Sequence, residues 1–293
     1  MTATTQWGTR SAILPIARRY RADRMYQCCQ LQGKFATDTL YSKCKSLRSN
    51  IAAQIYSHKC GFKAIYPLQK ANGEQVGQSL KDFIHDYGAP EHITFDGAMV
   101  QVGQNTPFVH TLRKYEIKHH VSSPRRPNKN PAESAIRETK KRWYRIMNKR
   151  KVPERLWDYG IQWVVETANI TANCSRYADG RTPLEIITGI TPDISEYLDF
   201  GFYDWVVYRS EAGLGPIDLG RWLGVSHRIG QQMSYWILPR SGIPISVVMV
   251  QRLTNLEQRT DEWKKRMDEY DTQLQSRLQT KSADISIDQN EVR

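Results

Sequence analysis

The chain has 293 residues and a mass of 34.0 kDa, which is enough for more than one domain with a hydrophobic core. Hydrophobic residues make up 40% of it and mean hydropathy is −0.61. No stretch approaches the roughly 18 apolar residues of a membrane helix, which excludes a membrane-spanning protein. The net charge of +12 favours a polyanionic partner, nucleic acid before membrane, and five cysteines without a C-x-x-C pair argue against a zinc ribbon.

Changes in period and composition divide the sequence into six predicted segments. Strand-like and helical patterns alternate in the longest segment, and short β-branched and aromatic runs separated by Gly-rich turns dominate a later one. The segments are a basic leader over 1–33, an α/β core over 34–180, a connector over 181–202, a small β-barrel over 203–255, a helix over 256–280 and a disordered tail over 281–293.

The core begins with three predicted strands and then alternates between helix and strand. The strands cover 34–40, 50–57 and 62–68, with Lys59-Cys60-Gly61 as a hairpin turn. Further predicted elements are a helix over about 76–87, a strand over 91–95, a helix around 104–114, a strand around 116–122, a long helix from 131 and another over about 154–174. This order predicts a mixed α/β sheet flanked by helices, whose first three strands form a meander.

The later part of the chain predicts an all-β module followed by a helix. Its four apolar runs, each bounded by turn residues, cover 204–208, 220–225, 233–238 and 243–250. From Leu256 to Leu278, apolar residues keep helical spacing among dense charges, which predicts a terminal helix.

Most of the net charge lies in one stretch. Thirteen Lys/Arg and three Asp/Glu fall between Lys118 and Arg155, so +10 of the +12 lies in 38 residues. Two interpretations stay open from composition alone, a solvated basic helix and a nucleic-acid surface.

Three acidic residues stand at positions where burial of their negative charge would cost free energy. Asp38 lies within the first strand, Asp96 ends the fourth, and Glu133 opens the long helix, with 57 and 36 residues between them. Each one alone is explained by a turn, a cap or the helix dipole. Brought together they would repel one another, unless two divalent cations about 4 Å apart lay between them, as in phosphoryl-transfer sites. Oxygen-only ligands suit Mg²⁺ or Mn²⁺.

These residues and several motifs in the same order resemble the D,D-35-E catalytic core of retroviral and retrotransposon integrases. The resemblance is strongest to copia-type (LTR) retrotransposon integrases, in particular a copia-like group of algae, and it covers about residues 24–256. The motifs are Gly33-Lys-Phe-Ala-Thr-Asp-Thr-Leu40, Pro90-Glu-His-Ile-Thr-Phe-Asp-Gly97, Asn128-Lys-Asn-Pro-Ala-Glu133, Val152-Pro-Glu-Arg-Leu-Trp-Asp-Tyr159, Asp179-Gly-Arg-Thr-Pro-Leu-Glu185, Leu198-Asp-Phe-Gly-Phe-Tyr203 and Gly220-Arg-Trp-Leu-Gly224.

The resemblance implies a ribonuclease H-like core that uses two Mg²⁺ or Mn²⁺ ions. It implies that Asp38, Asp96 and Glu133 are catalytic and bind the metal ions. Glu138 competes with Glu133 as the third acid, but five positions along a helix it would face elsewhere. Arg137 follows Glu133 at the interval typical of the family, which favours Glu133.

The long helix is predicted to carry one face for DNA and one for the core. Glu133, Arg137, Lys140, Lys141 and Tyr144 fall at offsets 0, 4, 7, 8 and 11. The core face is predicted to hold Ile136, Thr139, Trp143, Ile146 and Met147. Before the helix, Arg125, Arg126 and Lys129 belong either to a DNA-end contact or to a solvated basic loop.

The function expected from the resemblance is DNA integration: processing of DNA ends and their joining to target DNA by an Mg-dependent polynucleotidyl transferase. DNA is the expected partner, in a homo-oligomer that acts in the nucleus and assembles in the cytoplasm. Two alternatives remain open at this point. One is a catalytically decayed or domesticated integrase that only binds nucleic acid, and the other is a ribonuclease H-type nuclease.

Overall fold

The computed structural model describes residues 30–96, 106–122, 131–172, 180–209, 216–227 and 233–278. They form two compact units. The first comprises the described residues of 1–41, 52–136 and 171–191, and the second those of 42–51, 137–170 and 192–293. Among the described helices, none combines the length and the apolar character that crossing a membrane would need.

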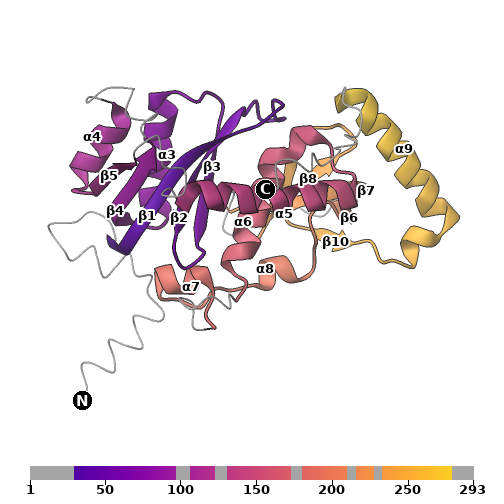
Figure 1. The fold of residues 1–293 in the computed structure, drawn as a ribbon. Coiled ribbons are helices and arrows are strands. Elements are labelled where there is room, and N and C mark those ends of the chain that lie inside the picture. The colour runs from indigo at the N-terminus through magenta and orange to yellow at the C-terminus, as the bar shows by residue number, and fades with distance from the viewer. Residues whose placement is uncertain are drawn as a thin grey trace, which may run out of the picture. The chain divides into compact units, whose positions relative to one another are not determined.

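A five-stranded mixed sheet forms the centre of the first unit, in the order β3-β2-β1-β4-β5 (Figure 1). Its strands are β1 (Gln30–Tyr41), β2 (Ala52–His58), β3 (Lys63–Leu68), β4 (Ala89–Asp96) and β5 (Lys118–Ser122). The ladders β1–β2 and β2–β3 are antiparallel, whereas β1–β4 and β4–β5 are parallel. The first three strands therefore form the predicted meander, and two strands reached by helical crossovers extend the sheet from β1.

Two helices cover one face of this sheet, α3 (Gly73–Asp86) and α4 (Pro107–Lys114). They lie close together, because a Cβ on Gly77 of α3 would come within 2.8 Å of Pro107 in α4. Phe35 of β1 and Phe95 of β4 are buried in the core of this side, together with Phe83 of α3. A short helix, α7 (Pro183–Thr188), packs on the same core through Leu184, Ile186 and Ile187.

The opposite face of the sheet receives the beginning of the long helix α5 (Pro131–Arg150). Ala132 and Ala135 of the helix are buried against Ala36 of β1 and Ile55 of β2. Proline at the first position suits the helix start, since its missing N–H has no partner there in any case. From residue 137 onward α5 belongs to the second unit.

In the second unit, α5 packs on α6 (Trp157–Asn169), which follows a 3-10 turn at Glu154–Leu156. Trp143 is 2% exposed, and a Cβ on Gly160 would lie 1.9 Å from its ring, so only glycine admits this close approach. The carboxylate of Asp158 in α6 is fully buried and accepts hydrogen bonds from Arg48 Nε at 2.8 Å and Asn50 Nδ2 at 2.7 Å. These bonds attach the segment 42–51 to α6.

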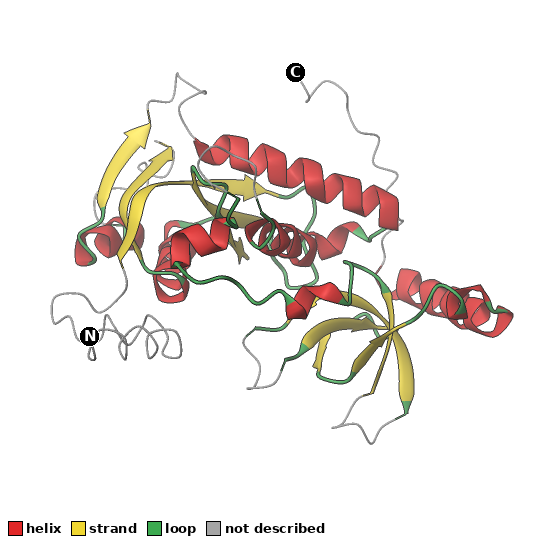
Figure 2. Cartoon of the chain, turned by 90° about the horizontal axis from the view of Figure 1, so that it is seen from below, coloured by secondary structure: helices red, strands yellow, loops and turns green. Residues whose placement is uncertain are grey.

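The second sheet is antiparallel throughout and has the order β10-β6-β7-β8-β9. Figure 2 shows its strands in yellow with the terminal helix at their side. Trp222, Ile237 and Val206 are fully buried in its core. Its strands are β6 (Trp205–Arg209), β7 (Ile217–Val225), β8 (Tyr235–Pro239), β9 (Ile245–Val247) and β10 (Val250–Arg252), and the short helix α8 (Ser195–Leu198) precedes them.

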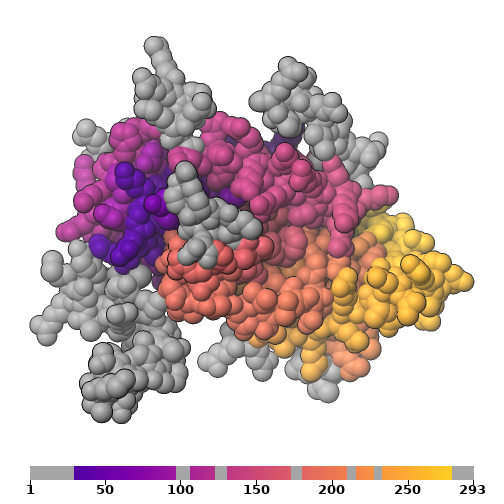
Figure 3. Space-filling model, turned by 60° about the horizontal axis from the view of Figure 1, so that its bottom comes forward, coloured from indigo at the N-terminus to yellow at the C-terminus, as the bar shows by residue number. Residues whose placement is uncertain are grey.

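The terminal helix α9 (Asp261–Leu278) follows a 3-10 turn at Glu257–Arg259 and lies beside the second sheet, yellow beside orange in Figure 3. The Tyr270 hydroxyl donates a 2.6 Å hydrogen bond to the Leu238 carbonyl of β8. Tyr270, Leu274 and Leu278 are all buried. The predicted helical spacing of this segment is thereby confirmed.

The predicted fold class is confirmed as a mixed α/β sheet flanked by helices, followed by an all-antiparallel sheet where a small β-barrel was predicted, and by a C-terminal helix. Two predicted elements differ. The strand over 243–250 is two strands, because the chain exchanges its partner β8 for β6 between Val247 and Val250. The helix over 154–174 ends at Asn169, where Ile170 and Thr171 have low helix propensity. The predicted tail at 281–293 lies outside the described residues.

Candidate active site at the end of the first sheet

Asp38 and Asp96 occupy neighbouring positions on two adjacent parallel strands. In the β1–β4 ladder Thr37 is the partner of Phe95, so the next position of each strand holds an aspartate. Side chains alternate between the two faces of a sheet. Because Phe35 and Phe95 both face the α3 and α4 side, Asp38 and Asp96 both project from the opposite face.

Glu133 stands on the helix that begins on that opposite face. It lies in the first turn of α5, between Ala132 and Ala135, which are buried against Ala36 of β1. Ala36 shares its face with Asp38, two positions further along the strand. The three predicted carboxylates therefore belong to one side of one sheet, although the sequence separates them by 57 and 36 residues.

Burial and the charges of the two other carboxylates act on Asp38. Burial raises the pKa of Asp38, and the negative charges of Asp96 and Glu133 raise it further. The Thr39 N–H, which donates a 2.7 Å hydrogen bond to Asp38 Oδ1, lowers the same pKa. Glu138 is absent from these influences on Asp38. It forms instead a 2.7 Å ion pair with Arg142 one turn along α5, as expected for an acid that faces elsewhere.

Buried hydrogen bonds hold the strand that carries Asp38. The Thr37 hydroxyl donates to the Ile55 carbonyl at 2.8 Å, and Gln54 Nε2 donates to Thr37 Oγ1 at 2.5 Å. The Thr39 hydroxyl donates to Gln54 Oε1 at 2.8 Å. Thr37 and Gln54 are fully buried, so this chain of bonds fixes β1 against β2 on both sides of Asp38.

The donor set of the three carboxylates fits a hard divalent cation, since all its donors are carboxylate oxygens and their mutual repulsion would be relieved by positive charge. The three side chains do not converge on one position that a metal ion could occupy. Among the residues that the structure describes, no three His, Cys, Asp or Glu side chains are close enough to hold one metal ion.

The division of α5 into two faces agrees with the sequence pattern. Thr139, Trp143 and Met147 are buried, and Ile146 is half-buried. On the predicted DNA face, Glu133, Arg137 and Lys141 are exposed, whereas Lys140 and Tyr144 are half-buried. Arg125, Arg126 and Lys129 lie outside the described residues.

Two basic residues on the sheet face that carries the aspartates were not singled out from the sequence. Lys34 and His92 lie on the same sheet face as Asp38 and Asp96, four positions earlier on their strands. The alternation of the two strands could have indicated them, because polar residues alternate there with Phe35, Ile93 and Phe95, which face the core on the other side of the sheet. His119 of β5 stacks on Phe95 with ring centroids 5.9 Å apart, which gives it a packing role.

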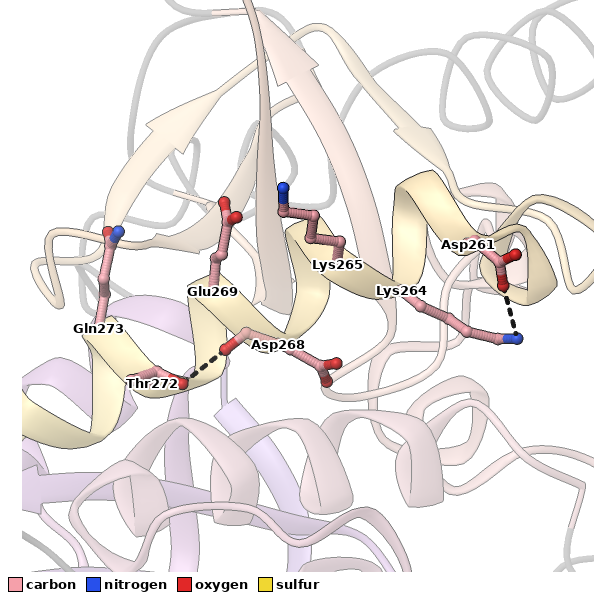
Figure 4. A pocket seen from close by; sticks show the side chains of 7 residues that line it. All are labelled: Asp261, Lys264, Lys265, Asp268, Glu269, Thr272 and Gln273. Carbon is pink, nitrogen blue, oxygen red and sulfur yellow. Dashed lines mark hydrogen bonds and ion pairs between the residues drawn. The ribbon is translucent and has the colours of Figure 1, made fainter.

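One pocket in the described structure follows α9 (Figure 4). It contains none of the predicted site residues. Its charges partly pair, since Lys264 Nζ lies 3.4 Å from Asp261 Oδ1. The lining residues are Asp261, Lys264, Lys265, Asp268, Glu269, Thr272 and Gln273.

A comparison of the sequence with protein-family models finds no match, and a comparison with curated proteins finds none either. Solved structures do resemble the fold. A chain of the simian T-cell lymphotropic virus intasome, in complex with the PP2A regulatory subunit B56 gamma, is 16% identical with a TM-score of 0.43. The match covers 82% of this chain and 88% of that chain.

Two isolated integrase catalytic core domains match about half of this chain. That of HTLV-2, in complex with magnesium, is 19% identical with a TM-score of 0.39 and covers 53% of this chain and 95% of its own. That of BIV is 16% identical with a TM-score of 0.39 and covers 53% and 92%. At these identities the likeness concerns the fold and not the chemistry.

Proposed function

We propose that this chain is a metal-dependent polynucleotidyl transferase that processes DNA ends and joins them to target DNA, the integrase of a copia-type retrotransposon related to those of algae. The observation that supports this proposal is the common position of Asp38, Asp96 and Glu133 on one face of a ribonuclease H-like sheet. The charges of Asp96 and Glu133 also raise the pKa of Asp38, after the larger effect of burial, which agrees with this common position.

In this proposal the three carboxylates hold two Mg²⁺ or Mn²⁺ ions. Such ions would supply an activated water or DNA 3′-hydroxyl and stabilise the leaving oxygen of the cleaved phosphodiester. The protein's own contribution is orientation: Thr39 N–H holds one oxygen of Asp38, which leaves the other available. No covalent intermediate on the protein is required.

The DNA backbone would follow the cationic side of α5. Arg137, Lys140 and Lys141 would contact its phosphates, with Tyr144 beyond them, whereas Arg125, Arg126 and Lys129 would hold the end of the DNA. Such contacts give affinity that depends strongly on salt and only weakly on base sequence.

The same proposal sets the assembly and the place of action. Joining both ends of an element to one target needs two catalytic sites acting together, so we propose a homo-oligomer. Because the target is chromosomal DNA, we propose that the protein acts in the nucleus after assembly in the cytoplasm.

The test is a strand-transfer assay with purified full-length chain. Labelled duplexes ending in the repeats that flank the source locus are incubated with Mg²⁺ or Mn²⁺ and target DNA. Asp96→Asn and Glu133→Gln are compared with Glu138→Gln, which removes a carboxylate from the same helix without touching the proposed site. Joined products are expected from the wild type and from Glu138→Gln, and none from the other two.

The other outcomes separate the alternative functions. Salt-sensitive DNA binding by every variant, without products from any, would contradict the enzyme and favour a binding module. Cleavage of RNA–DNA hybrids without joining of DNA would favour a ribonuclease H-type nuclease. Loss of activity in Glu138→Gln but not in Glu133→Gln would assign the third acid to Glu138.

A further inference from the structure

The face of the first sheet that carries the carboxylates also carries a regular arrangement of basic side chains. Three rows cross the parallel strands β1, β4 and β5. In the first row, Lys34 is the ladder partner of His92, which is the partner of Lys118. The second row contains His120 on β5, beside Thr94 of β4. The third row is the one that contains the two aspartates.

These basic residues point outward from a part of the sheet that is normally covered. Lys34, Lys118 and His120 are exposed and His92 is half-buried. Parallel strands are usually buried on both faces and apolar on both. Here only the α3 and α4 side of β4 is apolar, through Ile93 and Phe95. Packing within the described part of the chain therefore does not explain the basic side.

The charges of this face lie close to one another. Burial lowers the pKa of His92, and the positive charges of Lys34, His120 and His119 lower it further, against the raising effect of Glu91. Nδ1 of His92 is buried and has no hydrogen-bond partner among the residues that the structure describes. A group of like charges of this kind is stabilised by an external anion.

We propose that Lys34, His92, Lys118 and His120, the basic sheet face, bind the phosphate backbone of nucleic acid on one side of the bond that is cut. This inference rests on the proposed function, since it uses the same substrate. The first row lies four residues from the aspartates, which is about 13 Å at the rise of a strand and matches roughly four nucleotide steps along a duplex.

The test measures binding of a labelled DNA duplex to the full chain by fluorescence anisotropy at several salt concentrations. Lys34→Gln with Lys118→Gln removes two exposed charges from the face. Log affinity decreases with log salt, and each phosphate contact that is removed makes this dependence less steep by about 0.9. In the double variant the magnitude of the slope should therefore decrease by about 1.8. The decrease in affinity between 50 and 200 mM salt would then become about 12-fold smaller.

The matched control is Lys81→Gln with Lys114→Gln, on α3 and α4, which removes the same charge from the opposite side of the sheet. It is expected to leave the slope within about 0.5 of the wild-type value. Thermal unfolding of each variant verifies that all four substitutions leave the fold intact. Equal slopes for the two double variants would overturn the proposal.

His92 has its own readout. A bound phosphate favours its protonated form, whereas burial and the positive charge of Lys34 lower its pKa. Wild-type affinity should therefore rise between pH 7.5 and 6.0, and rise less in His92→Gln. An identical rise in that variant would remove His92 from the face.

Failure of this inference and failure of the proposed function give different results. If the wild type joins DNA ends but the Lys34 and Lys118 pair leaves the salt slope unchanged, the function stands and the basic sheet face is wrong. If the slope falls as expected but no variant yields products, the face binds nucleic acid and the catalytic proposal is wrong.

Discussion

Replacing Asp38 with asparagine should stabilise the folded protein in metal-free buffer. Asp38 is half-buried, and the charges of Asp96 and Glu133 oppose its ionisation. Asparagine has nearly the same shape and retains the oxygen that accepts from the Thr39 N–H. The substitution therefore removes a repelling charge while it preserves the local hydrogen bond.

The size of the effect follows from the register. Asp38 and Asp96 occupy adjacent positions of neighbouring strands on one face, which places their carboxylates roughly 6 Å apart. Two unit charges at that distance repel by about 2.8 kcal/mol at an effective dielectric of about 20. Solvent screening at these half-exposed side chains reduces this to about 1 kcal/mol, which is about 2–3 °C in Tm for a chain of this size.

The assay is thermal unfolding at neutral pH in chelating buffer and again in millimolar Mg²⁺. Asp38→Asn should unfold at a higher Tm than the wild type without metal, and Mg²⁺ should raise the wild-type Tm more than that of the variant. Glu91→Gln is the control, because it removes an exposed carboxylate from β4 outside the group and should change Tm by less than 1 °C or so. A Tm for Asp38→Asn at or below that of the control would refute the repulsion.

Three further outcomes concern packing and pH. In Asp158→Ala, the groups that donate hydrogen bonds to the buried carboxylate lose their acceptor. The free energy of unfolding, determined with urea, should therefore fall by about 3 kcal/mol. Gly160→Ala forces a methyl group into the ring of Trp143 and should cost about 2–3 kcal/mol by the same measurement, and a cost below about 0.5 would contradict the contact. Burial lowers the pKa values of His58 and His92, so the unfolded chain takes up protons first as pH falls below about 6.5. The free energy of unfolding should therefore fall between about pH 6.5 and 5, and fall less in His92→Gln.

The order of elements could be predicted from the sequence because each element of the first unit has a clear period. Lys59-Cys60-Gly61 indicated the turn between β2 and β3, and Gly61 adopts a φ of +95° there. Gly88 and Pro90 indicated the end of α3, which stops at Asp86. These signals are local, so they need no knowledge of which strands are neighbours.

The grouping of the carboxylates could be expected from the family resemblance but not from spacing. That Asp38 lies beside Asp96 depends on the parallel pairing of β1 with β4, which are more than 45 residues apart in sequence. The basic sheet face was missed for the same reason, since its members come from three different strands. The burial of Asp158 could not be predicted either, because nothing in the neighbouring sequence distinguishes a buried, hydrogen-bonded carboxylate from an exposed acidic residue of a helix.

Small residues explain how the sheet brings Glu133 near the aspartates. Where α5 begins on β1, the contact consists of Ala36 on the strand and Ala132 and Ala135 on the helix, all nearly or fully buried. Alanine at these positions lets the helix backbone approach the strand closely, as glycine does at other helix contacts. A larger side chain at any of them would raise the first turn of α5 from the sheet and move Glu133 away from Asp38. Ala132, in the motif that ends at Glu133, is therefore part of the site's geometry, because its small side chain determines how close to the sheet the third carboxylate lies.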